Sequence, residues 1–203
     1  MKTTRIGRLK LPNAFALALL LAGVILSPAP GHAGGATEDA PHGGVHQIDI
    51  EVEPIAYILG GAGVTIGYRV GSWRYAIEVY GLNVPERLHG NEGFDAAGLG
   101  VELHIEHFFD DRAGGFHFGP ELALSRLDVT HRESGETTGR LNYSVGLRGG
   151  YRWYTGVGGL YLNPVGGFMY TLNAADIELA DESFETGSLT PFVTVGAGWR
   201  FRL

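Results

Sequence analysis

The stretch LTPFVTVGAGWRFRL, from Leu189 to Leu203, places an apolar or aromatic side chain at every second position. The intervening positions hold hydroxyls, glycines, one phenylalanine and the two arginines Arg200 and Arg202. Successive side chains of a β-strand point to opposite faces, so one face of this segment suits lipid and the other suits a polar interior. The stretch therefore predicts a strand in the wall of a membrane barrel.

The same period of two recurs along the chain. It is found in residues 47–59, 62–70, 73–84, 95–109, 115–130, 140–154 and 159–172. With the last stretch this makes eight strands, an even number as expected for a bacterial single-chain barrel. In 115–130 the alternation changes parity near Arg126, which predicts a bulge or the end of the embedded part. The predicted fold class is all-β, an eight-stranded antiparallel up-and-down transmembrane β-barrel.

The links between these strands alternate in length, apart from the short first link at Gly60-Gly61. The links after strands two, four and six are short, whereas those after strands three, five and seven are longer and acidic. Short turns are periplasmic in outer-membrane barrels, so both termini are expected in the periplasm. Aromatic residues near the short-turn ends predict a girdle at the membrane boundary: Tyr68, Trp73, Tyr75, Phe109, Phe116, Tyr151, Trp153, Trp199 and Phe201.

The first 33 residues have the parts of a secretory signal: a basic start, an apolar run and a tail ending in Gly-His-Ala. We expect cleavage after Ala33, a flexible periplasmic lead-in over 34–46 and the barrel over 47–203. The sequence contains no cysteine, which excludes disulfides and thiolate metal sites. It has 22 acidic and 15 basic residues, and both lysines lie in the signal. This balance argues against nucleic acid as a partner.

An eight-strand pattern behind an export signal, closing with Val193 to Leu203, resembles the small outer-membrane β-barrels of the OmpA and OmpX type. The resemblance implies an outer-membrane location, contact with lipid and lipopolysaccharide, and a structural or surface-interaction role without enzymatic activity or cofactor. It also implies that the C-terminal strand is recognised by the barrel assembly machinery. Members of this family usually end in an aromatic residue, whereas this chain ends in Leu203 and carries Phe201 two positions earlier.

The polar faces of the predicted strands carry seven acids, six arginines and two histidines. An eight-stranded interior is just wide enough for side chains to fill it, so these groups are expected to form an ion-pair network. Closure places the three acids of the first strand beside the arginines of the last, which predicts bridges across that junction. The network comprises Asp49, Glu51, Glu53, Arg69, Arg74, Glu78, Glu102, His104, Glu106, His117, Glu121, Arg148, Arg152, Arg200 and Arg202.

Two alternative functions are considered, a soluble binding barrel and a lipid A-modifying enzyme. A soluble periplasmic calycin-like barrel also has eight strands, but its apolar face points inward around a ligand. Some small barrels instead trim lipid A acyl chains with a serine, a histidine and an acid. His131 and Ser134 lie close in sequence, with Glu133 and Glu136 beside them, although a triad is recognised by geometry. We expect no enzymatic activity.

Two groups of residues are candidates for metal binding. Counting back from the turn between strands four and five sets Glu106 near His117 and Glu102 near Glu121, with His104 on the same face. These groups could bind a divalent metal or perform acid and base chemistry, but pairing with Arg148 and Arg152 is the favoured interpretation. The last long loop offers weaker candidates for calcium or magnesium, against the simpler interpretation of a solvated acidic loop: Asp176, Glu178, Asp181 and Glu182.

Overall fold

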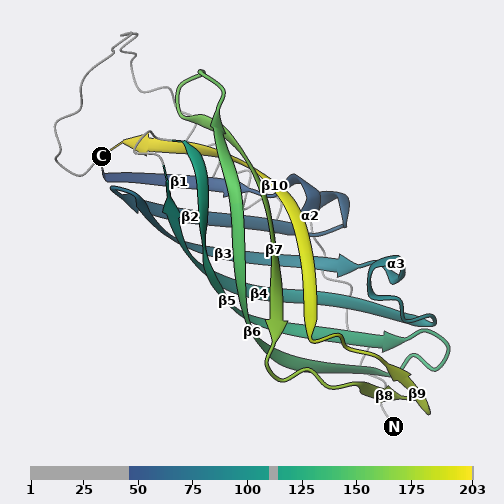
Figure 1. Cartoon of the computed structure of the whole chain (residues 1–203). Coiled ribbons are helices and arrows are strands. Elements are labelled where there is room, and N and C mark those ends of the chain that lie inside the picture. The colour runs from purple at the N-terminus through teal and green to yellow at the C-terminus, as the bar shows by residue number, and fades with distance from the viewer. Residues whose placement is uncertain (1–45, 110–113, 203) are drawn as a thin grey trace. The chain divides into compact units, whose positions relative to one another are not determined.

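The computed structural model describes residues 46–109 and 114–202, which form a closed antiparallel barrel in the order β1-β10-β7-β6-β5-β4-β3-β2 (Figure 1). The predicted fold class is confirmed. The wall strands are β1 His46–Val52, β2 Ala62–Val70, β3 Trp73–Val84, β4 Phe94–Phe108, β5 Gly115–His131, β6 Thr137–Tyr154, β7 Leu160–Thr171 and β10 Leu189–Arg202. The predicted signal and most of the lead-in lie outside the described residues.

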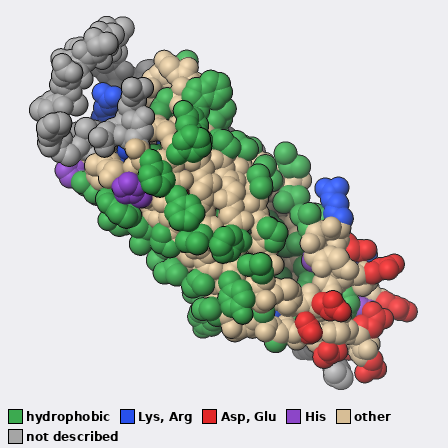
Figure 2. All heavy atoms as spheres, in the orientation of Figure 1, with side chains coloured by type: hydrophobic (Ala, Val, Ile, Leu, Met, Phe, Trp, Pro, Cys, Tyr) green, Lys and Arg blue, Asp and Glu red, His purple; other side chains and the backbone are tan. Residues whose placement is uncertain are grey.

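The polarity of the barrel is the inverse of that of a water-soluble protein. Val79 on the outer face is 57% exposed, whereas the inward-facing Arg74 and Glu106 are 1% and 0% exposed. Figure 2 shows hydrophobic side chains spread over the middle of the visible surface. A calycin-like barrel needs the opposite arrangement, with apolar side chains inside, so the geometry contradicts that alternative.

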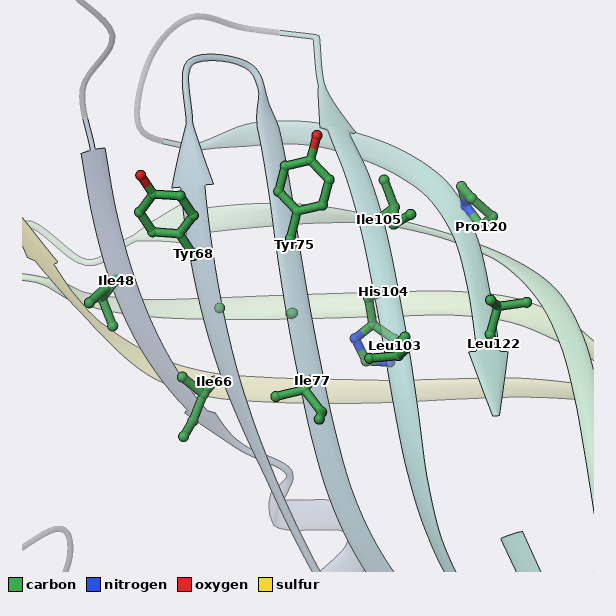
Figure 3. A pocket seen from close by; sticks show the side chains of 12 residues that line it. Ile48, Ile66, Tyr68, Tyr75, Ile77, Leu103, His104, Ile105, Pro120 and Leu122 are labelled. Carbon is green, nitrogen blue, oxygen red and sulfur yellow. The ribbon is translucent and has the colours of Figure 1, made fainter. Parts of the chain in front are cut away.

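The outer wall is shaped by side chains from neighbouring strands. Ile66, Ile77 and Leu103 stand on β2, β3 and β4 and line an apolar groove of about 620 Å³ (Figure 3). Tyr68 and Tyr75 border the groove on the side of the β2–β3 turn. Such a surface is suited to hydrocarbon and poorly suited to water.

The first predicted strand is wrong beyond Val52. Residues Pro54–Ile58 form the short helix α2. Proline has no N–H to donate, and this costs nothing in the first turn, where the N–H groups of a helix have no partner within the helix. The N–H of Gly61 donates to the carbonyl of Ala56 at 2.8 Å and closes the helix. The barrel wall is therefore shorter at the first hairpin than elsewhere.

Of the two predictions for the parity change in β5, a bulge or the end of the embedded part, the bulge is absent. Its pairing runs from Gly115 opposite Arg152 to Thr130 opposite Thr137 with a constant register. Leu127 faces inward and packs with Val129 among apolar residues at the end of the barrel that carries the long loops, called here the long-loop end. The change of hydrophobic parity therefore marks a change in the lumen from charged to apolar.

A small hairpin, the apical hairpin, folds within the last long loop and was not predicted. It consists of β8 Ile177–Leu179 and β9 Glu182–Phe184, with Ala180 and Asp181 at positive φ in its turn. Its Ile177 and Phe184 pack against inward-facing residues of β4 and β5. We call this group the apical cluster; its buried members are Phe94, Ala96, Val129, Ile177 and Phe184.

Hydrogen bonds fix the apical hairpin to the loop between β3 and β4, which contains the short helix α3 Glu86–His89. Asn91 accepts from the N–H of Glu185 at 2.7 Å and donates to its carbonyl at 3.1 Å. The ring of His89 lies 5.1 Å from that of Phe184. No helix within 46–109 or 114–202 is long and apolar enough to cross a membrane.

Candidate functional site

Arg74 is the centre of the ion pairs nearest the short-turn end of the lumen. Its Nη2 lies 2.6 Å from Asp49 Oδ1, and its Nη1 lies 2.7 Å from Glu106 Oε2. Asp49 stands on β1 and Arg74 on β3, so the pair reaches across β2 at Gly67. A Cβ at Gly67 would lie 2.6 Å from Arg74 Nη2 and 2.7 Å from Asp49 Oδ1. Glycine at this position is therefore what allows the two side chains to meet.

Arg152 contributes a second positive charge to the same region. Its Nη1 lies 3.3 Å from Asp49 Oδ2, and its guanidinium stacks 4.2 Å above the ring of Tyr161. The Tyr161 hydroxyl donates to Asp49 Oδ1 at 3.0 Å. Glu51 lies 3.7 Å from Arg152 Nη2 and accepts from the amide of Asn163 at 3.2 Å.

The predicted bridge between the first and last strands does not form. Asp49 is opposite Arg200 in the β1–β10 register, but its carboxylate turns toward Arg74 and Arg152 instead. Arg200 stacks 4.2 Å above the ring of Tyr154, and Arg202 is exposed. The reason is reach: a long arginine from β3 or β6 crosses the narrow lumen, so backbone neighbours need not be charge partners.

Arg69 contacts an aromatic ring and a backbone carbonyl at the short-turn end of the lumen. Its guanidinium lies 4.1 Å from the ring centroid of Phe108, and its Nε donates to the carbonyl of Gly71 at 2.8 Å. Both contacts are near the β2–β3 turn. Arg69 therefore closes the short-turn end of the lumen beside the Arg74 and Arg152 ion pairs.

The central cluster lies further along the lumen and consists of Glu78, Glu102, His104, Glu121 and Arg148. Arg148 Nη1 lies 2.8 Å from His104 Nε2 and 3.6 Å from Glu121 Oε2. Arg148 Nε lies 3.3 Å from Glu106 Oε1, which links this cluster to the Arg74 ion pairs. Glu53, at the start of α2, lies against Gly63, where a Cβ would meet both Glu53 and Glu78.

The predicted β4–β5 juxtapositions are right for one pair and wrong for the other. His117 Nδ1 lies 3.7 Å from Glu106 Oε1, as expected. Glu121, however, is opposite His104, and Glu102 is opposite Ala123. The actual register differs by two residues from the count across the turn, because that count assumed a tighter hairpin than the one that joins Phe109 to Phe116.

At the long-loop end, His131 lies between Ser134 and Glu182. Its Nδ1 is 3.0 Å from Ser134 Oγ, and its Nε2 is 3.4 Å from Glu182 Oε2. Sequence proximity indicated the serine and the histidine, but the acid comes from the apical hairpin and replaces the expected Glu133 and Glu136. Ser134 Oγ also accepts from the N–H of Glu136 at 3.2 Å, as in a local turn.

The four loop acids considered for calcium or magnesium do not converge. Asp176 accepts from the N–H of Thr186 at 2.9 Å, Glu182 faces His131, and Glu178 and Asp181 are exposed. Over the described part of the chain, the ligating atoms close enough to share one ion belong to Glu78, Glu102 and His104. Figure 2 shows acidic side chains gathered at one end of the molecule.

An eight-stranded antiparallel wall with a charged interior and an apolar exterior is the architecture of small outer-membrane barrels. No protein-family model matches the sequence, and no curated protein matches it. Among solved structures the chain resembles Neisserial surface protein A, with 15% identity, a TM-score of 0.50 and coverage of 79% of this chain and 97% of that one. It is also similar to the N-terminal β-barrel domain of Pseudomonas aeruginosa OprF, with 11% identity, a TM-score of 0.45 and coverage of 78% and 99%.

Proposed function

We propose that this protein is an outer-membrane barrel with a closed lumen and a structural or surface-interaction role in the envelope of a Gram-negative cell. The observation that carries the proposal is the inverted polarity of the wall. Side chains such as Val79 face outward over the middle of the barrel, while Asp49, Arg74 and Glu106 are buried inside. Only hydrocarbon on the outside makes both faces favourable at once.

The orientation follows from the two ends of the barrel. The short turns and exposed aromatic residues such as Trp73 and Trp153 are at one end, and the acidic loops with the apical hairpin are at the other. We assign the short-turn end to the periplasm and the long-loop end to the cell exterior. The start of β1 and the end of β10 then both lie on the periplasmic side. Lipid and lipopolysaccharide are then the immediate partners, and β10 is the strand offered to the assembly machinery.

A closed lumen distinguishes this proposal from a porin. Arg74, Arg148 and Arg152 extend over intervening strands to Asp49 and Glu106, and the apical cluster lies beyond them. Water and ions have no wide path past such side chains. We expect no stable conductance when the refolded barrel is reconstituted in a planar bilayer.

Membrane fractionation combined with a heat-modifiability gel tests the proposal. The protein should sediment with outer membranes and migrate faster when unboiled than when boiled. Spin labels at Val145 and Trp199 should report a hydrocarbon environment, and a label at the exposed Asp181 serves as the aqueous control. Release by osmotic shock, or water contact at both wall positions, contradicts it.

A second candidate function is hydrolysis of a lipid acyl ester, and it is favoured by the Ser134, His131 and Glu182 arrangement alone. A histidine between a hydroxyl and a carboxylate can remove the hydroxyl proton as the oxygen attacks an ester. Mass analysis of lipid A from cells expressing Ser134→Ala tests it, with Ser183→Ala on the apical hairpin as the control. Loss of a deacylated species in Ser134→Ala alone supports hydrolysis, and unchanged lipid A removes this candidate.

A further inference from the structure

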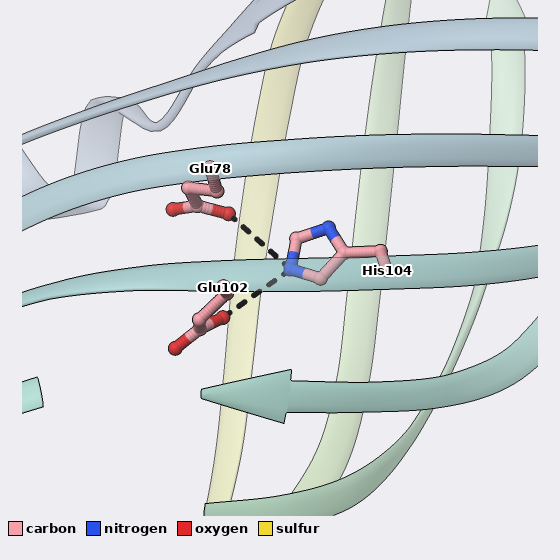
Figure 4. Close-up of side chains that lie close together, drawn as sticks. All are labelled: Glu78, Glu102 and His104. Atoms are coloured by element: carbon pink, nitrogen blue, oxygen red, sulfur yellow. Dashed lines mark hydrogen bonds and ion pairs between the residues drawn. The ribbon is translucent and has the colours of Figure 1, made fainter. Parts of the chain in front are cut away.

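We propose that Glu78, Glu102 and His104 bind a divalent transition-metal ion inside the barrel. The three side chains come from the adjacent strands β3 and β4 and point to one place in the lumen (Figure 4). His104 Nε2 lies 3.3 Å from Glu102 Oε2 and 3.7 Å from Glu78 Oε2. All three ligand atoms lie within 4.8 Å of one another.

The two distances from His104 Nε2 resemble those between ligand atoms around one ion. A tetrahedral ion with bonds of about 2.0–2.1 Å to nitrogen and oxygen holds its ligand atoms about 3.3–3.5 Å apart. The two distances from His104 Nε2 are close to that range without any rearrangement of the backbone. One imidazole with two carboxylates is a donor set for zinc, manganese or iron rather than for magnesium.

The charges around these ligands favour a cation. Glu78 and Glu102 are directly opposite in the β3–β4 register, an arrangement that is destabilising for two like charges. Glu53 approaches from the start of α2. Arg148 is the nearby arginine, and it is shared with Glu106 and Glu121. The carboxylates therefore outnumber the positive charge available to them.

Glu121 gives an independent indication of a ligand. It is 1% exposed, stands opposite His104 on β5, and neither of its carboxylate oxygens has a hydrogen-bond partner. Its Oε2 lies 3.6 Å from Arg148 Nη1. A buried carboxylate without a hydrogen bond is costly, and water bound to an ion in the central cluster would supply the missing partner.

Arg148 lies beside the proposed ligands and is in contact with the imidazole of His104. Its Nη1 lies 2.8 Å from His104 Nε2 and 3.0 Å from His104 Nδ1, so it places a positive charge against the imidazole that would coordinate the metal. The Nε of Arg148 also lies 3.3 Å from Glu106 Oε1. Arg148 can therefore remain paired with Glu106 when the imidazole of His104 binds a metal ion. The positive charge of Arg148 therefore opposes a cation on the same imidazole, and its removal should strengthen metal binding.

The test uses the full mature chain without an affinity tag, refolded in detergent and stripped with EDTA. Native mass spectrometry with Zn²⁺ should give one ion per chain, and Zn²⁺ should raise the urea midpoint of unfolding, because an ion that binds only the folded state stabilises it. Glu102→Gln and His104→Gln should weaken Zn²⁺ affinity at least tenfold. Arg148→Gln should bind Zn²⁺ more tightly than the wild type.

Glu51→Gln is the matched control, since Glu51 is also a buried lumen carboxylate but bonds Asn163 outside the central cluster. Its Zn²⁺ affinity should be unchanged. Glu102 is the most accessible ligand, at 19% side-chain exposure, and its neutralisation removes a like-charge pair. Glu102→Gln should therefore fold, with a metal-free urea midpoint at or above that of the wild type, and should lose the stabilisation by Zn²⁺.

Three results would overturn the proposal. The first is the absence of a bound ion and of a midpoint shift in the wild type at millimolar Zn²⁺. The second is equal binding by the wild type, Glu102→Gln and His104→Gln, which would locate zinc on the exposed acids and histidines instead. The third is weaker binding by Arg148→Gln in a protein that still folds, because it would mean that Arg148 supports metal binding and does not oppose it.

Discussion

Arg74 Nη2 and Asp49 Oδ1 lie 2.6 Å apart across the intervening strand β2, directly over Gly67. Both side chains are 1% exposed, so neither charge has water to turn to if the other is removed. Breaking one partner of a buried pair typically costs about 3–5 kcal/mol. We expect Asp49→Ala to lower the free energy of unfolding by that amount in urea titrations of the barrel in lipid vesicles.

The exposed pair of Arg126 and Asp128 is a suitable control, with Nε and Oδ1 2.8 Å apart and the two side chains 62% and 39% exposed. Asp128→Ala should cost less than about 1 kcal/mol, because water replaces the lost partner. Gly67→Ala should resemble Asp49→Ala without changing any charge. Equal costs at Asp49 and Asp128 would contradict a stabilising role for the buried pair.

Phe184 should stabilise the apical hairpin without stabilising the barrel. Its ring is 3% exposed and packs edge-on to Phe94 at a centroid distance of 5.6 Å. Phe184→Ala should cost about 3–5 kcal/mol of local stability, enough to open a small hairpin that is not part of the wall. Hydrogen exchange should lose protection over 177–184 and keep it in β5 and β6. Leu88→Ala, at a site that is 62% exposed, should change neither.

His89 should make the same hairpin sensitive to acid. Burial lowers the pKa of the His89 imidazole below its ordinary value of about 6.5, with Glu86 opposing the shift and Arg132 adding to it. Its Nδ1 accepts from the N–H of Asn91 at 3.1 Å, a bond that protonation would remove. The contribution of neutral His89 to the stability of the apical hairpin is thus complete above pH 6.5. It decreases as the pH falls through the folded-state pKa of His89.

Nuclear magnetic resonance titration of the His89 ring checks the direction of this shift. Hydrogen exchange of 177–184 at pH 5.0 and 7.5, corrected for intrinsic rates, checks the consequence. His89→Phe should keep the contact with Phe184 and abolish the pH dependence. A folded-state pKa above 6.5 would contradict the prediction.

A charge placed on the outer wall should be tolerated according to depth. Leu147 lies in the middle of β6 on the outer face, whereas Leu172 follows the end of β7 at the long-loop end. Leu147→Arg should lower the free energy of unfolding in lipid by about 2–4 kcal/mol, and Leu172→Arg by about 0–1 kcal/mol. Equal effects at both positions would argue against hydrocarbon around β6.

The strands of the barrel wall were predictable because a shift of one residue would exchange their apolar and polar faces, at a large energetic cost. Shifting β6 by one residue would bring Arg148 to the lipid face, so its sequence admits one register parity. Seven of the eight strands lie within a few residues of their predicted bounds. The eighth, β1, was predicted too long because residues 53–59 keep alternating in sequence although Pro54 begins a helix.

The interior contacts were less predictable. The sequence indicates which side chains face the lumen, but long arginines choose among several carboxylates at similar distances. Asp49 meets Arg74 in place of Arg200 for this reason, and glycine at position 67 decides the outcome. The Glu78 contribution to the central cluster depends on the β3–β4 register, and the apical hairpin depends on apolar partners distant in sequence. No local pattern encodes either one.

The short first hairpin has a mechanical consequence. The junction between β1 and β10 pairs only from Gln47 with Arg202 to Val52 with Ala197, so residues 189–196 of β10 are paired with β7 alone. The junction between β5 and β6 extends from Gly115 with Arg152 to Thr130 with Thr137, nearly the full length of both strands. Under mechanical load, β1 and β10 should be the first neighbouring strands to separate. During biogenesis, the same short junction should be the last to form.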